Sequence, residues 1–289
     1  MRFLAKANRW SWPPTTGLPW TSVQGVFGDV KTALSTTNMR DLTVLIPTWN
    51  DAEALSVTLT AFASLPTELK DRLDVVVSDG ASSDHTLDVL STHVDLVRRV
   101  SSRPDRGVYD AMNLGVACAS GSHVWVVGAG DIPDGEGLAH AMDVLTADPL
   151  PKAHAWPVAA LPPVEPGVPA RFEPDWGEVL TWRNTMHHQG LVAPKAWLEA
   201  HPFDPSLNTL GDYAQMLEWR NKGHLVTCHS ERTLCHVAPA GLSRKFNAAL
   251  YQEEWRMKKA RLRGPRRWAQ PLWLVAKWAF KQVSTVARI

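Results

Sequence analysis

Short apolar runs that end in polar turns constrain this chain more than any other feature of its sequence. They occupy residues 42–46, 73–77 and 124–127, and they are rich in Val, Leu and Ile. None of the runs alternates cleanly between apolar and polar residues, which is typical of strands buried on both faces. Pro47, Asp79-Gly80 and Gly128 follow the three runs. The sequence therefore predicts three buried strands, each with a sharp end.

Helical patterns separate these strands. Apolar spacing and capping residues predict helices over 51–64, 85–93, 110–120 and 210–222, and further strands at 94–100 and within 184–194 and 227–237. Alternating strands and helices at this spacing predict a mostly parallel sheet with helices on both faces. The proline-rich stretch 149–174 is expected to make a long surface excursion over the site.

Polar residues gather at the ends of the predicted strands. Pro47-Thr48, Asp79 and Asp131 each follow one apolar run. Ligands bind outside the carboxyl ends of the strands in open parallel sheets. These three strand ends therefore predict one binding site at that edge of the sheet.

Residues 105–115 form the most distinctive segment of the chain. They bring Asp105, Arg106, Tyr109, Asp110 and Asn113 together around a glycine turn that precedes a predicted helix. A purely structural turn does not need two carboxylates, an arginine, a tyrosine and an asparagine. The mixture favours a ligand-binding role.

Two of the strand-end carboxylates allow two interpretations each. Asp131, after Gly128-Ala129-Gly130, suits a hard divalent cation that also binds phosphate oxygens, or a simple turn aspartate. Asp79 can accept a hydrogen bond from a base or ribose, or belong to a well-capped strand–helix turn. The capping interpretation fits the following Ser83 and Asp84 better than it fits Asp79.

Charge and cysteine content limit the partners and the compartment. The formal net charge of +1 argues against a nucleic-acid partner, but no acidic residue follows Glu254 while ten basic residues do. Three cysteines do not make a disulfide framework, so we expect a reducing cytoplasm. Residues 1–20 do not resemble a signal peptide, and no run of about 18 apolar residues predicts a membrane-spanning helix.

The basic tail predicts a separate helical segment. We expect an irregular arm over 1–40, a catalytic domain over 41–245 and a basic amphipathic helical segment over 246–289. One helical face of the tail carries Trp268, Leu272, Val275, Ala279, Val283 and Val286, and the opposite stripe carries Lys277, Lys281 and Arg288. Such a helix either lies on an anionic membrane surface, at the inner face of the cell membrane, or packs on the body or on a second subunit.

The motifs, taken in order, resemble glycosyltransferase family 2, the inverting transferases of the GT-A fold. Within that family the chain is most similar to bacterial capsule, exopolysaccharide and colanic-acid-type enzymes. The matching pieces are residues 44–50, 79–84, 105–115, 128–132, 188–190, 203–204, 212–213 and 240–243, which together span roughly 42–245. The resemblance implies an α/β, Rossmann-like GT-A fold with a mostly parallel sheet flanked by helices.

The same resemblance implies roles for individual residues. It places one group of residues around the nucleotide and the donor sugar, with Asp79 at the base and Ser243 and Arg244 at the donor phosphates in a loop that closes over them. That group comprises Pro47, Thr48, Asn50, Asp79, Asp105, Asp110, Asn113, Ser243 and Arg244.

The family's metal motif is only partly present. Asp131 takes its final position and would bind Mg²⁺ or Mn²⁺ with the donor diphosphate, but Gly130 stands where many members carry an aspartate. His236 is a second candidate metal or diphosphate ligand. Asp212 opens the predicted 210–222 helix where the family places its catalytic base, although a helix N-terminus also stabilises a carboxylate with no catalytic role. His188 would touch the diphosphate, position the acceptor or lie in the core.

These residues predict transfer of a sugar from a UDP-, GDP- or dTDP-type donor to a glycan or lipid-linked acceptor in cell-surface polysaccharide synthesis. Two alternatives remain open. A degenerate glycosyltransferase-like module would bind a sugar nucleotide, or nothing, without turnover, and Gly130 favours it. A nucleotidyltransferase would need a glycine-rich, basic phosphate loop after the first strand, where this chain has Pro47-Thr48-Trp49-Asn50.

Overall fold

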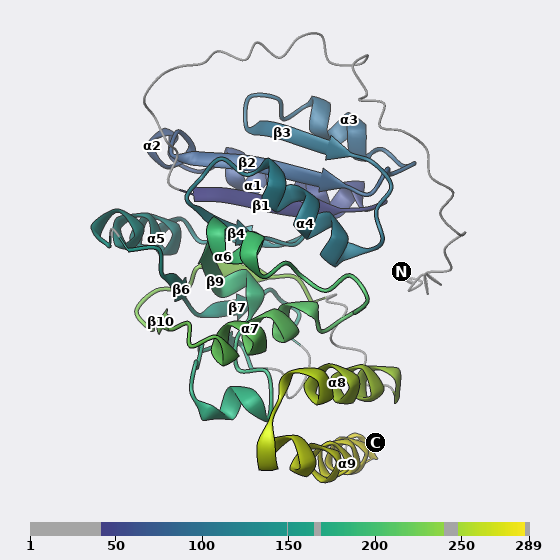
Figure 1. Cartoon of the computed structure of the whole chain (residues 1–289). Helices are drawn as coiled ribbons and strands as arrows, with labels where there is room; N and C mark the ends of the chain where they lie inside the picture. The colour runs from purple at the N-terminus through teal and green to yellow at the C-terminus, as the bar shows by residue number, and fades with distance from the viewer. Residues whose placement is uncertain (1–41, 149, 165–168, 240–247, 287–289) are drawn as a thin grey trace. The chain divides into compact units, whose positions relative to one another are not determined.

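A seven-stranded sheet forms the centre of the molecule (Figure 1). The computed structural model describes residues 42–148, 150–164, 169–239 and 248–286, and side chains only as far as residue 279. The strand order is β10-β6-β9-β4-β1-β2-β3, and β9 alone runs antiparallel to its neighbours in this sheet. The strands are β1 (Leu42–Thr48), β2 (Leu73–Asp79), β3 (Val97–Ser102), β4 (His123–Val126), β6 (Ala153–Ala155), β9 (Leu191–Pro194) and β10 (Val226–Cys228). The predicted mostly parallel sheet is confirmed.

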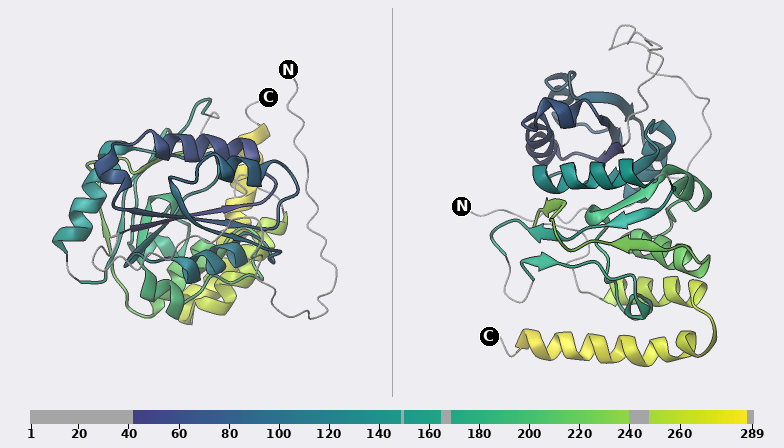
Figure 2. Two further views of the ribbon diagram at one scale, coloured as in Figure 1. Left: turned by 90° about the horizontal axis from the view of Figure 1, so that it is seen from above. Right: turned by 90° about the vertical axis from the view of Figure 1, so that its left-hand side faces the viewer.

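Helices cover both faces of this sheet, as Figure 2 shows from two directions. Every residue of β1 and β2 is buried, and side chains of alternating residues point to opposite faces. Val44 and Ile46 share one apolar cluster with α1 (Ala52–Ala63), α3 (Thr86–Ser91) and α5 (Gly135–Ala147). Leu45 shares the other with α4 (Val108–Cys118), α6 (Lys195–Ala200) and α7 (Gly211–Asn221). Burial on both faces explains why these strands appear in the sequence as continuous apolar runs.

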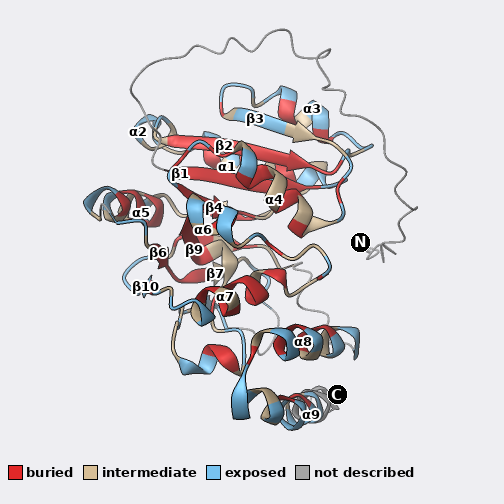
Figure 3. Cartoon of the chain, viewed as in Figure 1, coloured by how far each residue is buried: buried red, intermediate tan, exposed pale blue. Residues whose placement is uncertain are grey.

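β3, the edge strand next to β2, is more exposed than β1 and β2. β3 pairs only with β2, and none of its residues is buried (Figure 3). A short helix, α2 (Thr67–Lys70), connects α1 to β2. The predicted strand at 94–100 is therefore confirmed with a shift, because its pairing with β2 begins only at Val97.

A second, four-stranded sheet has the order β5-β11-β7-β8. Its strands are β5 (Ile132–Pro133), β7 (Val158–Ala160), β8 (Arg171–Phe172) and β11 (Cys235–Val237). Two 3₁₀ turns, η1 (Glu178–Thr181) and η2 (His188–Gly190), lie between β8 and β9 in the chain. β5 directly follows Asp131, so this sheet supports the turn that carries that carboxylate.

The predicted surface excursion over 149–174 is wrong for residues 153–160, which form β6 and β7. β6 pairs with both β9 and β10 inside the main sheet, and Trp156 is only 1% exposed. The strand is three residues long and built from Ala, His and Ala, so it lacks the aliphatic run that marks β1 and β2. The predicted 227–237 strand is likewise two strands, β10 and β11, which belong to different sheets.

The tail contains two helices, α8 (Ala248–Arg261) and α9 (Gly264–Val286), which contact each other. The fully buried Lys258 ammonium lies 2.8 Å from a Glu254 carboxylate oxygen and donates to the Trp182 carbonyl at 2.6 Å and to Gln270 at 3.1 Å. Gln270 in turn donates to the Thr181 carbonyl. These bonds attach both helices to η1. No helix in the described ranges is long and apolar enough to cross a membrane.

Removal of the buried Lys258 ammonium should weaken the attachment of α8 and α9 to η1. We expect Lys258→Met to lower the free energy of unfolding by about 3 kcal/mol, because the buried Glu254 carboxylate would lose one of its two cationic partners. Urea unfolding followed by circular dichroism measures the change. Lys259→Met, on the exposed side of the same helix, is the matched control. Equal stability of the two variants would contradict the role of this buried ion pair.

Candidate active site

The loops after β1 and β2 are hydrogen-bonded to each other at the carboxyl edge of the sheet. The backbone N–H of Asn50 donates to Ser82 Oγ at 2.7 Å. The side-chain oxygen Oδ1 of Asn50 accepts from the backbone N–H of Ser83 at 2.7 Å. The Ala52 N–H at the start of α1 donates to Asp84 Oδ2 at 3.0 Å. Asn50 holds a left-handed φ of 49°, which asparagine tolerates better than most residues. Asn50, which the sequence predicts to contact the nucleotide, therefore lies in a loop that hydrogen bonds hold to the neighbouring loop.

Pro47 and Thr48 occupy the last two positions of β1, so the strand extends beyond the predicted end at Pro47. Thr48 is buried, and its Oγ1 has no hydrogen-bond partner among the described residues. A buried hydroxyl is normally paired with protein or water. An unpaired hydroxyl at the end of β1 therefore marks a place where a ligand or water can bind.

Asp79 lies at the end of β2 and is only 1% exposed. One carboxylate oxygen accepts from Ser82 Oγ at 2.5 Å, and the other accepts from Ser102 Oγ at 2.6 Å. The structure thus joins the ends of β2 and β3 through this side chain. Its assignment to the nucleotide base stays a prediction, and a base would have to share or displace these serine hydroxyls.

Asp105 packs against the β2–α3 turn. A Cβ atom on Gly80 would lie 2.8 Å from Asp105 Oδ2, so the glycine makes room for the carboxylate. Burial raises the pKa of Asp105, the Gly107 N–H opposes that shift, and the charges of Asp110 and Asp79 add to it. Asp105 and Asp79 therefore lie close to each other at the same edge of the sheet.

Asp110 and Asn113 are engaged within the protein. Asp110 accepts from the Arg106 guanidinium at 2.8 and 3.2 Å, and these hydrogen bonds lower its pKa. The Asn113 amide both donates to the Phe203 carbonyl and accepts from the Phe203 N–H, each at 2.9 Å. The structure therefore places Asn113 between α4 and the Phe203 loop, where its amide fixes that loop.

Asp131 is 3% exposed, and its carboxylate accepts hydrogen bonds from several N–H groups. Its Oδ2 accepts from the Gly128 N–H at 3.0 Å and from Gln189 Nε2 at 3.1 Å, while Oδ1 accepts only from the Ala238 N–H at 2.8 Å among the described residues. Burial raises the pKa of Asp131 despite these donors and the nearby His188. Gly130, next to it, has a φ of 93°, a left-handed value that favours glycine. Local backbone conformation thus explains why glycine occupies this position.

His236 does not join Asp131 in a ready-made metal site. Its Nε2 lies 3.2 Å from Asp134 Oδ2, on the carboxylate that also caps α5. Among the described residues, no group of three His, Cys, Asp or Glu side chains is arranged to hold a metal ion. Asp131 Oδ1 accepts a single hydrogen bond, from the Ala238 N–H, within the part of the chain that the structure describes.

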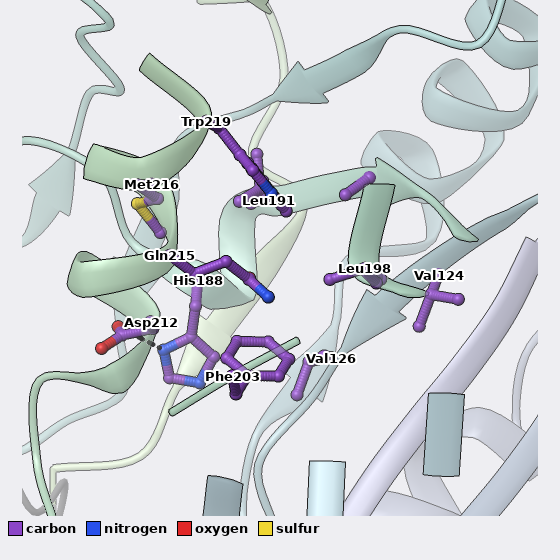
Figure 4. A pocket seen from close by; sticks show the side chains of 11 residues that line it. Val124, Val126, His188, Leu191, Leu198, Phe203, Asp212, Gln215, Met216 and Trp219 are labelled. Carbon is purple, nitrogen blue, oxygen red and sulfur yellow. Dashed lines mark ion pairs between the residues drawn. The ribbon is translucent and has the colours of Figure 1, made fainter. Parts of the chain in front are cut away.

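Asp212 lies in the first turn of α7 and contacts the side chains of His188, which Figure 4 shows beside it, and Tyr109. Its Oδ2 is 3.3 Å from His188 Nδ1, and its Oδ1 accepts from the Tyr109 hydroxyl at 3.2 Å. Burial raises the pKa of Asp212, but the hydrogen bond and charge of His188 and the Tyr213 N–H lower it more, so the net shift is downward. The carboxylate is therefore ionised at neutral pH.

Protein atoms pack closely around the Asp212–His188 pair on the side that faces the interior. A Cβ atom on Gly211 would lie 2.7 Å from the Tyr109 ring, so glycine is required where α7 begins. Behind Asp212 and His188 is an apolar cavity of about 20 Å³, lined among others by Val126, Phe203 and Trp219 (Figure 4). The cavity is large enough for one water molecule and too small for a sugar.

The η2 turn connects the two carboxylates that the sequence selected. His188 contacts Asp212, and the next residue, Gln189, donates to Asp131. The turn itself is held by the Trp125 indole, which donates to the Gln189 carbonyl at 2.7 Å. Sequence reasoning gave no role to Gln189 or to Trp125, because their partners are distant in the chain.

Glu253 of α8 was also not recognised from the sequence. Its carboxylate accepts three backbone N–H groups, from Asn208, Thr209 and Leu210, at 3.0, 2.8 and 2.8 Å. These residues lead directly into Gly211 and Asp212. The tail therefore fixes the loop that positions Asp212. Ser243 and Arg244, the predicted donor-phosphate residues, lie outside the part of the chain that the structure describes.

Comparison with known proteins agrees with this geometry. Residues 43–155 match the family model described as Glycosyl transferase family 2. A PGL/p-HBAD biosynthesis glycosyltransferase of Mycobacterium tuberculosis is 36% identical over 91 residues, which cover 30% of this chain and 34% of that protein. The probable glycosyltransferase YdaM of Bacillus subtilis is 33% identical over 106 residues, 34% of this chain and 25% of that protein. The chain thus spans about a third of these relatives or less.

Solved structures cover more of the chain at lower identity. TarS residues 1–349 of S. aureus, in complex with UDP-GlcNAc, aligns with a TM-score of 0.61 at 17% identity, covering 75% of this chain and 65% of that one. The mannosyltransferase PcManGT of Pyrobaculum calidifontis, with GDP-Man and Mn²⁺, gives a TM-score of 0.55 at 19% identity over 87% and 76% of the two chains. Such similarity shows a shared fold.

The family model and the solved structures cover different lengths of the chain. The family match includes β1, β2, α4 and the Asp131 turn, and the structural match extends over most of the chain. Residues 43–155 therefore match glycosyltransferase family 2, and the chain has the α/β GT-A fold of nucleotide-sugar-dependent glycosyltransferases.

Proposed function

We propose that this protein transfers a sugar from a nucleotide-sugar donor to a glycan or lipid-linked acceptor, with inversion at the anomeric carbon. The observation that carries the proposal is the Asp212 carboxylate, held by His188 and Tyr109 in the same site as Asp131. A binding module has no need of an ionised, oriented carboxylate at that point. The resemblance to capsule and exopolysaccharide enzymes supports cell-surface polysaccharide synthesis as the process.

The hydrogen-bonded loops at the strand edge support a nucleotide-sugar donor. Thr48, Asn50, Asp79 and Asp105 surround the ends of β1 and β2, where a nucleotide binds in sheets of this type. The similar solved structures hold UDP-GlcNAc in TarS and GDP-Man in PcManGT. A UDP- or GDP-sugar is therefore the first donor to test here, with dTDP-sugars as the third class.

Asp212 would act as the general base. Its lowered pKa keeps it ionised at neutral pH, and His188 and Tyr109 fix both oxygens in orientation. As the acceptor oxygen bonds to the anomeric carbon, its proton passes to Asp212. The bond from that carbon to the donor phosphate oxygen breaks, and its electron pair leaves with the nucleoside diphosphate.

A divalent cation fits this site through Asp131. A hard cation such as Mg²⁺ or Mn²⁺ is often held by one or two carboxylates together with substrate phosphates and water, and Asp131 Oδ1 has spare acceptor capacity. When bound, the cation would offset the negative charge that develops on the leaving diphosphate. Gln189 and the Gly128 N–H would hold the carboxylate in place.

Donor binding should depend on the cation. With Mn²⁺ present, one nucleotide class among UDP-, GDP- and dTDP-sugars should raise the melting temperature by roughly 5 °C or more near saturation. EDTA should abolish that rise in the wild-type protein. Asp131→Asn should also abolish it, whereas Asp143→Asn, an exposed carboxylate on α5, should retain it.

Thermal scans without ligand show whether Asp131→Asn remains folded, and the EDTA comparison on the wild-type protein does not depend on that variant. A donor-induced rise that persists unchanged in EDTA would contradict the cation assignment. No response to any sugar nucleotide would favour the non-catalytic module instead.

Loss of the base should remove turnover and preserve donor binding. We expect Asp212→Asn to lower kcat by about 10² to 10⁴, because the proton acceptor is gone while the nucleotide loops are unchanged. Transfer or slow donor hydrolysis, measured beside donor-induced thermal shift, separates the two effects. Asp71→Asn, an exposed carboxylate before β2, is the control. Full transfer activity in Asp212→Asn would refute the assignment.

Glu253 should affect kcat through the position of Asp212. Glu253→Gln replaces one acceptor oxygen with an NH₂ group that faces a backbone N–H, so the 208–210 loop should shift. We expect kcat to fall about tenfold with little change in the KM for the donor. Glu218→Gln, at a partly exposed position of α7, is the control. A change confined to the donor KM would contradict a positioning role.

A further inference from the structure

The outer face of α9 is apolar and exposed. Trp268, Leu272 and Val275 are 75%, 78% and 64% exposed, and Ala279 lies on the same helical stripe. They are spaced three or four residues apart, so their side chains point to one side of the helix. A surface helix normally turns charged or polar residues outward, but this stripe contains none among the described side chains. The side chains of Val283 and Val286, which the sequence places on the same stripe, lie outside the described part.

The inner face of α9 is already occupied. Gln270 and Leu274 are buried, and Gln270 bonds to both Lys258 and the Thr181 carbonyl. The Lys277 ammonium lies 2.8 Å from a Glu254 carboxylate oxygen, and the Trp273 indole donates to the Trp182 carbonyl at 2.9 Å. These bonds fix the rotation of the helix, so the outer stripe cannot turn inward to cover itself. Figure 2 shows α9 beside α8 at the edge of the described body.

Cations surround the start of this stripe. Arg263 is exposed just before α9, and the Arg267 guanidinium lies 5.6 Å from the centre of the Trp268 ring, whereas Arg266 is paired with Glu178 at 2.6 Å. Arg256 and Lys259 are exposed on α8. No acidic residue follows Glu254, and Glu254 itself is buried against Lys258 and Lys277. The tail surface therefore combines exposed apolar side chains with positive charge.

We propose that the outer face of α9 binds the surface of an anionic lipid bilayer, with the helix lying in the plane of the interface. Leu272 and Val275 would enter the acyl region, Trp268 would sit at its boundary, and the arginines would contact anionic headgroups. Apolar area and basic charge together are what stable interfacial binding requires.

Charge decides between a bilayer and a second copy of the chain. Two copies that met through this stripe would place the basic segment that follows Glu254 in one copy against the same segment of the other, and the cations would repel each other. An anionic surface neutralises the same cations and covers the same apolar side chains. The sequence left membrane binding and packing on the body open, and the structure shows that opposite faces of one helix are available for the two roles.

Flotation of the full-length protein with lipid vesicles tests the proposal. Wild-type protein should float with phosphatidylcholine vesicles that contain about a third phosphatidylglycerol, and bind at least about tenfold more weakly to pure phosphatidylcholine or at high salt. Val275→Glu should weaken binding to the anionic vesicles about tenfold or more. The matched control is Val94→Glu, at a valine that is 57% exposed in the loop before β3. It should bind like the wild type.

Both variants replace exposed side chains, so melting temperature and donor-induced thermal shift should be unchanged. Loss of vesicle binding with an intact donor response would separate this proposal from the proposed reaction. Failure of the wild-type protein to bind anionic vesicles would overturn the proposal. So would equal binding to neutral vesicles, or a dimer that sedimentation velocity detects and Val275→Glu dissociates while vesicles have no effect.

Discussion

The candidate site depends on the contacts that the η2 turn makes with two carboxylates. Two consecutive residues, His188 and Gln189, contact Asp212 and Asp131, which are 81 positions apart in the chain. Each carboxylate is largely removed from water, so each needs donors to remain in place. The turn supplies a donor to both, and Trp125 holds the turn against β4. A shift of this turn would therefore displace the proposed base and the proposed cation ligand together.

The tail is joined to this site by buried polar contacts. Glu253 holds the loop that enters α7, and Lys258 holds α8 and α9 to η1. The same contacts leave the outer face of α9 apolar and exposed. One segment thus supports the position of Asp212 on its inner side and presents a surface on its outer side.

Sequence patterns located the elements whose residues are buried on both sides. β1, β2 and β4 carry continuous apolar runs, and their polar ends, Thr48, Asp79 and Asp131, were placed at the correct edge of the sheet. The short strand β6 was missed because alanine and histidine give no such run, and α5 was missed because Gly135 and Gly137 weaken the helical pattern at its start. Gly137 is there because Thr233 packs against it, a contact that no local pattern reveals.

Local periodicity was enough to predict the class of sheet, and motifs of neighbouring residues were enough to propose a strand-end site and its candidate carboxylates. The partners that hold the candidate residues in place, by contrast, are set by the tertiary structure. Asn113 is engaged by Phe203, His236 by Asp134, and Asp212 by Tyr109 and His188, all through contacts between distant segments. Donor capacity and burial depend on which segments meet in space, and one-dimensional spacing does not encode that.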